Sequence, residues 1–129
     1  MKIIYTALFV KDEEELLKMF PPIHDYVFAH HSTIKFKPKN IDDISIGKEV
    51  IIKIIGRVYD DRADALIIEN EKTENSHPHI TISCADGVVP YYSGEMIRKM
   101  SSNNEIKYFD QPVEIEMVEG YFDGSNDIK

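Results

Sequence analysis

Two short strings in the chain repeat one pattern of residues that can do acid–base chemistry. The first is His31-Ser32-Thr33-Ile34 and the second is His79-Ile80-Thr81-Ile82, so each reads His, any residue, Thr, apolar. Both strings lie in segments whose composition predicts β-strands. Because alternate residues of a strand point to the same face, the His and Thr of each string should project together, while Ile34 and Ile82 point toward a core.

Two imidazoles and two hydroxyls on facing strands suit the in-line opening of a cyclic phosphodiester. One histidine would take a proton from the attacking water and the other would protonate the leaving oxygen, since the reference pKa of histidine is about 6.5. The threonine hydroxyls would donate hydrogen bonds to the phosphoryl oxygens as their charge develops. This chemistry requires no metal ion and no organic cofactor.

The paired motifs resemble those of the 2H phosphoesterase superfamily. That group includes bacterial RNA 2′,3′-cyclic phosphodiesterase/2′,5′-ligase proteins, nucleotide cyclic phosphodiesterases, the cyclase–phosphodiesterase part of fungal tRNA ligases, and phage enzymes that degrade cyclic oligonucleotide signals. The resemblance implies that His31 and His79 form the acid–base pair, with roles set by the orientation of the substrate, and that Thr33 and Thr81 hold the phosphoryl oxygens. The chain is short for this family, which indicates that insertions that usually shape substrate choice are missing.

The same resemblance implies the fold class. It is an α+β fold with two pseudo-symmetric lobes of antiparallel β-sheet, the two sheets flanking an active-site groove and the helices packed on the outer sides. The sequence itself echoes two related halves. Residues 50–56 resemble residues 113–120, and each segment is followed by an aromatic residue and an aspartate, Tyr59-Asp60 and Phe122-Asp123.

Two helices and seven strands are expected around the motifs. The first helix starts at Asp12, whose side chain can cap it, and ends at Pro21-Pro22. The second helix takes Ser93 as its N-cap and buries Met96, Ile97 and Met100. The strands are expected over residues 3–10, 27–37, 49–59, 65–69, 79–84, 105–109 and 113–122. Residues 124–129 are expected to be a frayed tail.

Further residues near the motifs are candidates for substrate binding. Lys35 continues the predicted face of His31 and is expected to bind phosphate. Tyr91 and Tyr92 follow the second motif, and one of them could stack on a nucleobase at the mouth of the groove. His30 is adjacent to His31 and should face away from it, which favours a structural or exposed role.

A metal site is the competing interpretation of the clustered histidines. His77 shares the alternation of His79, although the proline between them leaves its direction open. Asp25 and Asp86 could complete such a site but stand at no diagnostic spacing, so no metal is expected. Cys84 is expected to be a small buried hydrophobe rather than a nucleophile.

Composition restricts the class of partner. The chain has 129 residues and a formal charge of −8, with 43% hydrophobic residues, as expected for a single globular domain over residues 1–129. The acidity argues against binding to long duplex nucleic acid but allows a nucleotide or an RNA terminus in a local pocket. A single cysteine, and no signal peptide or membrane segment, favour a cytoplasmic protein.

Three hypotheses follow. The first is a metal-independent phosphoesterase that hydrolyses a 2′,3′-cyclic phosphate on an RNA end or nucleotide, or a small cyclic oligonucleotide. The second is a nucleotide- or RNA-end-binding module that sequesters its ligand without efficient catalysis. The third is a small interaction domain without chemistry, which predicts that His31 and His79 lie far apart.

Overall fold

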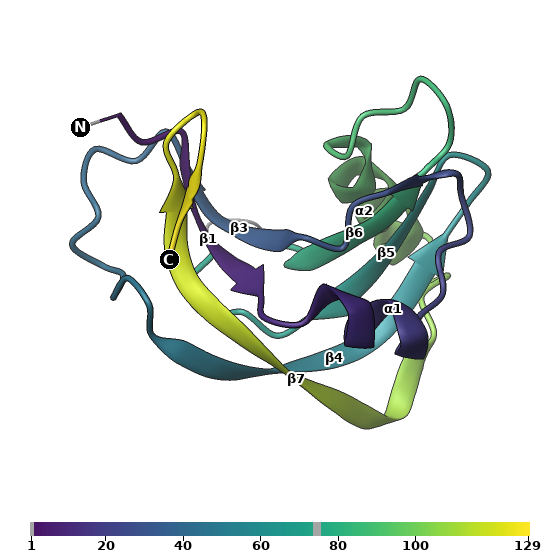
Figure 1. Ribbon diagram of the computed structural model, residues 1–129. Helices are drawn as coiled ribbons and strands as arrows, with labels where there is room; N and C mark the ends of the chain where they lie inside the picture. The colour runs from purple at the N-terminus through teal and green to yellow at the C-terminus, as the bar shows by residue number, and fades with distance from the viewer. Residues whose placement is uncertain (1, 74–75) are drawn as a thin grey trace.

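The computed structural model describes residues 2–73 and 76–129 of the chain. Within these ranges two helices and eight strands form an α+β fold in which all strand pairs are antiparallel (Figure 1). The helices are α1 (Glu13–Met19) and α2 (Tyr92–Ser102). The strands are β1 (Tyr5–Val10), β2 (Tyr26–Val27), β3 (His31–Phe36), β4 (Glu49–Tyr59), β5 (Ala63–Ile68), β6 (His79–Cys84), β7 (Tyr108–Phe122) and β8 (Asp127–Ile128).

The described strands belong to one sheet rather than to two. Their order is β2-β6-β5-β4-β7-β1-β3, and β8 pairs with β7. The long strands β4 and β7 bend, so the sheet curls, and β3 at one end contacts β6 near the other (Figure 1). The backbone N–H of Ala29, just before β3, donates to the carbonyl of Thr81 in β6 at 2.9 Å. This curl of a single sheet brings the two motif strands together.

The strand expected over residues 27–37 is interrupted. Residues 28–30 separate β2 from β3, and Ala29 has a φ of 52°. This left-handed backbone conformation is uncommon for residues other than glycine. It turns the chain out of β2 and into β3, so His30 does not follow the alternation of a continuous strand.

The two strands expected near the C-terminus form one strand, β7. Pro112 lies inside it, although proline removes a backbone donor from a sheet. The pairing of β4 with β7 is irregular at this place, where the register shifts between Ile54 and Gly56 and skips residues 109–112. Proline is therefore tolerated because no regular ladder bond is needed there.

The ends of the helices are explained in part by the sequence. Asp12 caps α1, as expected, and its Oδ1 accepts a hydrogen bond from the N–H of Glu15 at 3.0 Å. The prediction that Ser93 caps α2 is wrong, because the helix already starts at Tyr92 and Ser93 is buried in its first turn. Neither helix in the described ranges has the length and apolar character needed to cross a membrane.

The hydrophobic core sets the direction of both motifs. Ile34, Ile80 and Ile82 are almost fully buried in one cluster that also includes residues of α1, β1 and β5. The prediction that Ile34 and Ile82 point into a core is confirmed, and strand alternation directs the intervening motif residues to the other side. A second cluster packs α2 against β5 and includes Cys84, which is buried as expected.

The C-terminal residues are not a frayed tail. The Asp123 carboxylate accepts hydrogen bonds from the N–H groups of Ser125 and Asn126 at 2.8 and 2.6 Å, and Gly124 takes a φ of +102° in this tight turn. The chain then returns as β8, where Asp127 pairs with Phe122 of β7. This turn places the side chain of Asp127 beside the first motif.

Candidate active site

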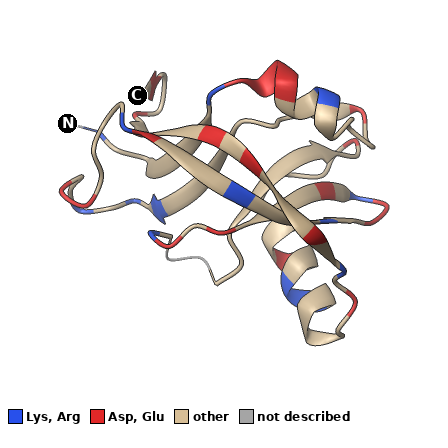
Figure 2. Ribbon diagram, turned by 90° about the horizontal axis from the view of Figure 1, so that it is seen from below, with Lys and Arg blue, Asp and Glu red and all other residues tan. Residues whose placement is uncertain are grey.

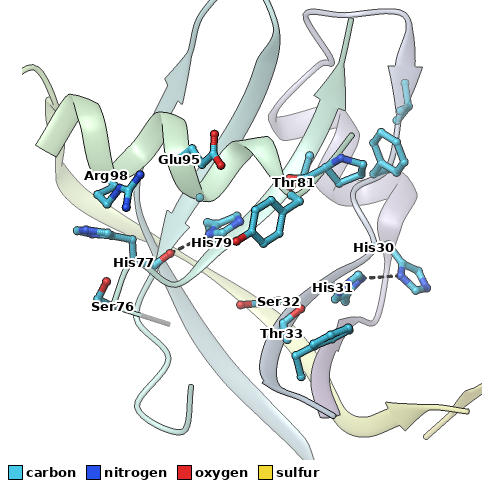
Figure 3. A pocket seen from close by; sticks show the side chains of 16 residues that line it. His30, His31, Ser32, Thr33, Ser76, His77, His79, Thr81, Glu95 and Arg98 are labelled. Atoms are coloured by element: carbon cyan, nitrogen blue, oxygen red, sulfur yellow. Dashed lines mark hydrogen bonds between the residues drawn. The ribbon is translucent and has the colours of Figure 1, made fainter. Parts of the chain in front are cut away.

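Both motifs line one cavity of about 910 Å³, within the usual size range of small-molecule sites. His31 and Thr33 come from β3, and His79 and Thr81 come from β6 (Figure 3). The cavity therefore gathers the four motif residues, which the chain separates by more than forty positions, into one space. The other described lining residues are Val27, Phe28, His30, Ser32, Phe36, Ser76, His77, Pro90, Tyr91, Gly94, Glu95 and Arg98.

The imidazole of His31 is packed and poorly hydrated. The ring of Tyr5 stacks on it, with 4.7 Å between ring centroids and 16° between the planes. Burial lowers the pKa of His31 from 6.5 to about 4; the neighbouring His30 and His79 act in the same direction, and Asp127 opposes them. His31 is therefore neutral at neutral pH, and its pKa responds to the charge of His79.

A chain of two hydrogen bonds extends from His31 through His30 to Asp127. Nδ1 of His31 lies 2.8 Å from Nδ1 of His30 (Figure 3). Nε2 of His30 lies 2.6 Å from Oδ2 of Asp127. The prediction that His30 faces away from His31 is wrong, because the turn at Ala29 reorients it. Asp127 was not a candidate, since it lay in the expected tail. The Asp-Gly turn before it was the sequence signal that could have indicated a returning strand.

His79 is held by the backbone. Its Nδ1 lies 2.8 Å from the carbonyl oxygen of His77, so Nδ1 carries the proton and donates, leaving Nε2 as the other ring nitrogen. Gly94 of α2 lies beside the ring, and a Cβ added there would make an ordinary van der Waals contact of 3.6 Å with Cε1 of His79. Burial lowers the pKa of His79, although the bond to the His77 carbonyl acts in the opposite direction.

The two threonines differ in their surroundings. The backbone carbonyl of Thr33 accepts a hydrogen bond from the hydroxyl of Thr73 at 2.7 Å, which anchors β3 beside the cavity. The hydroxyl of Thr81 donates to Oγ of Ser93 at 2.9 Å and also lies 3.4 Å from the carbonyl of Pro90. A phosphoryl oxygen would therefore compete with Ser93 for the Thr81 proton.

The structure separates the expected binding residues. Tyr91 lines the cavity and is 81% exposed. Tyr92 lies outside the lining, and its hydroxyl donates to Asp60 instead. Lys35 is also outside the lining, and its ammonium pairs with Asp43 at 3.0 Å. A bulge in the pairing of β1 with β3 breaks the alternation before Lys35, so that Phe36 lines the cavity in its place.

The charge of the cavity differs from that of the chain. Among its described lining residues, Glu95 is the only carboxylate and Arg98 is the only lysine or arginine, and both come from α2. Arg98 and His77 lie on the same side of the cavity as His79, opposite His30 and His31 (Figure 3). The acidic residues gather elsewhere, on the first turn of α1 and along the long central strands (Figure 2). An anionic ligand in the cavity is therefore not opposed by a local excess of carboxylates.

The described residues contain no cluster of three or more His, Cys, Asp and Glu side chains placed to hold a metal ion. Asp25 and Asp86, the carboxylates weighed for such a site, do not line the cavity.

No protein-family model matches the chain, and no curated protein matches it either. Among the described residues, the cavity combines four imidazoles, including those of His31 and His79, with the two motif threonines, one guanidinium and one exposed tyrosine.

Proposed function

We propose that the protein is a metal-independent phosphoesterase of the two-histidine type that hydrolyses a cyclic phosphodiester. The substrate class is a 2′,3′-cyclic phosphate on a nucleotide or RNA terminus, or a small cyclic oligonucleotide. One observation carries the proposal: His31, Thr33, His79 and Thr81, from strands that are distant in the sequence, line the same cavity.

The reaction needs two proton transfers and stabilisation of charge on phosphorus. The oxygen of a water molecule attacks phosphorus in line, and the bond from phosphorus to the leaving ribose oxygen breaks. One histidine Nε2 takes a proton from the water, and the other gives a proton to the leaving oxygen. The hydroxyls of Thr33 and Thr81 donate to the equatorial oxygens, and Arg98 adds positive charge to the cavity.

The rest of the ligand would occupy the remainder of the cavity. Tyr91 is exposed at the cavity, where its ring can stack on a nucleobase. We also propose that the fold consists of two related lobes. In this description β3 and β6 are corresponding strands, one from each lobe, that face each other across the groove. The curl that brings β3 against β6 supports it.

A panel of substrates tests the proposal. Purified protein is incubated with a 2′,3′-cyclic nucleotide, cyclic dinucleotides, cyclic oligoadenylates and an RNA that ends in a 2′,3′-cyclic phosphate, and products are separated by chromatography. We expect turnover of at least one of them in the presence of EDTA. His31→Ala and His79→Ala should each reduce the rate by about 10² to 10⁴.

The matched control is Asp42→Asn, an exposed residue outside the cavity, which should leave the rate unchanged. Far-UV circular dichroism checks that each variant is folded. Full activity in either histidine variant, or loss of activity in EDTA that zinc restores, would contradict the proposal.

A second candidate is a module that binds a nucleotide or RNA end without efficient turnover. The contact between Thr81 and Ser93 favours it, because the hydroxyl needed by the phosphoryl group already has a partner. Isothermal titration with the same panel separates the two functions. Tight binding that depends on His31 and His79, with no product, would support the module.

A further inference from the structure

We propose that His30 and Asp127 are positioning residues that make His31 the general acid of the reaction, which leaves His79 as the general base. This inference rests on the proposed function and assigns the two roles that the motifs alone leave open. It comes from two hydrogen bonds that join β8 to the start of β3.

The carboxylate fixes the first hydrogen bond of the chain. An ionised Asp127 can only accept, so Nε2 of His30, at 2.6 Å, must carry a proton. Nδ1 of His30 then faces Nδ1 of His31 at 2.8 Å, and one proton must lie between these two nitrogens. Two arrangements satisfy this geometry, and they differ in which ring owns the shared proton.

The two arrangements correspond to two states of His31. When His30 is neutral, the shared proton belongs to Nδ1 of His31, and Nε2 of His31 has a free lone pair. When His30 is charged, its Nδ1 donates the shared proton, and His31 remains neutral with its proton on Nε2. In this second state His31 presents an acidic N–H to the cavity without carrying a charge itself.

The carboxylate at the end of the chain contacts His30 and not His31. His30 pairs with Asp127 at the edge of the cavity, and its side chain is 34% exposed. His31 is enclosed by the ring of Tyr5 and faces His79 across the cavity. Burial, with smaller effects of His30 and His79, lowers the pKa of His31 to about 4, so the doubly protonated ring is disfavoured.

Two other titratable groups, Lys129 and Tyr5, lie near the pair. The ammonium of Lys129 lies 5.2 Å from the ring centroid of Phe9, which packs edge-on against His30 at 5.4 Å. Burial, with Asp127 as the second cause, raises the pKa of Tyr5 to about 12, so Tyr5 stays neutral beside His31. Asp127 is therefore the only carboxylate shown in direct contact with either ring of the pair among the described residues.

His79 lacks such a chain. Its Nδ1 donates to a backbone carbonyl, which cannot exchange a proton with it, so Nε2 of the neutral ring has a lone pair directed away from the backbone. Burial lowers the pKa of His79 and keeps this neutral form at neutral pH. The unprotonated Nε2 is the form that a general base needs.

The assigned step balances in protons and bonds. Water attacks phosphorus while Nε2 of His79 takes its proton, and the bond to the leaving oxygen breaks while Nε2 of His31 protonates that oxygen. The shared proton moves from Nδ1 of His30 to Nδ1 of His31, so the positive charge passes from His30 to His79. His79 then returns its proton to solvent, and the half-exposed His30 takes one up.

The assignment of His31 as the general acid can be tested with a substrate whose leaving group does not need to be protonated. Asp127→Asn keeps the size and the acceptor oxygen of the side chain but removes its charge. We expect kcat for the oxygen substrate to fall by about 10²-fold with KM nearly unchanged. With the same cyclic phosphodiester carrying sulfur in place of the leaving oxygen, the variant should retain the wild-type rate, because a thiolate leaves without protonation.

His79→Ala is the contrasting variant, and it should slow both substrates. Asp42→Asn, the same chemical change at an exposed site outside the cavity, should slow neither. Equal losses on the oxygen and sulfur substrates in Asp127→Asn would overturn the assignment of His31 as the acid.

A second measurement does not depend on turnover. In protein labelled with ¹⁵N-histidine, we expect a scalar coupling across the hydrogen bond between the two Nδ1 atoms of His30 and His31. The proposed role of Asp127 requires that the shared proton belong to His30 in the wild type and to His31 in Asp127→Asn. Failure to find the coupling would overturn this inference, whereas its presence in a protein that turns over no substrate would refute the proposed function and leave the hydrogen-bonded chain intact.

Discussion

The pH dependence of folding stability provides a test of the cavity that does not require a substrate. The pKa of His31 is lowered from 6.5 to about 4, mainly by burial, so folding favours its neutral form. This contribution to stability is fully present above the unfolded pKa of 6.5 and is lost as pH falls to about 4. At about 1.4 kcal/mol per pKa unit, the loss is about 3 kcal/mol. That is a large share of the 5–15 kcal/mol by which domains are typically stable.

The variant His31→Asn isolates the contribution of His31 protonation to the free energy of unfolding. Urea unfolding of the wild type and the variant is followed at several pH values between about 7.5 and 3.5. Any effect of the substitution on packing appears at every pH and cancels when the two curves are compared. We expect the wild type to lose about 3 kcal/mol more than the variant over this range. Parallel curves would show that His31 is well hydrated, and the reasoning from the cavity geometry would fail.

Two further predictions concern the supports of the site. Thr33→Val and Thr81→Val keep the shape of the side chains but remove a donor, so each should reduce kcat by about 10² to 10³, measured with the best substrate of the panel; unchanged rates would remove the threonines from the mechanism. Gly120→Ala should displace β8, because the added Cβ would overlap the carbonyl of Ile128. It should therefore reproduce the kinetic defect of Asp127→Asn, and retention of normal turnover on the oxygen substrate would contradict this link.

The direction of the two motifs could be predicted from local sequence alone. Strand alternation has a period of two, and the isoleucines Ile34 and Ile82 mark the face that must be buried. The start and end of α1 were also predictable, since Asp12 is a strong cap and consecutive prolines end a helix. These features depend on interactions within a few residues.

Features that depend on irregular backbone could not be predicted in this way. The left-handed conformation of Ala29 breaks the expected strand and turns His30 toward its neighbour, although nothing in its residue type indicates it. The bulge between β1 and β3 removes Lys35 from the cavity. Each irregularity changes the face on which all later residues of the strand lie, so a single one is enough to alter the site.

Contacts between distant parts of the chain are the second kind of feature that could not be predicted from the sequence. Asp127 meets His30 across 97 positions of the sequence, because the turn at Asp123 returns the chain along β7. Arg98 reaches the cavity because α2 packs on β5. Such placements follow from tertiary packing, which cannot be predicted from the local pattern of a single sequence.

A crystal structure of the protein with bound phosphate tests the central claim most directly. We expect the anion in the cavity, within hydrogen-bond distance of Nε2 of both His31 and His79 and of the hydroxyls of Thr33 and Thr81. An anion held elsewhere, or imidazoles that cannot contact one phosphorus centre from opposite sides, would contradict the account.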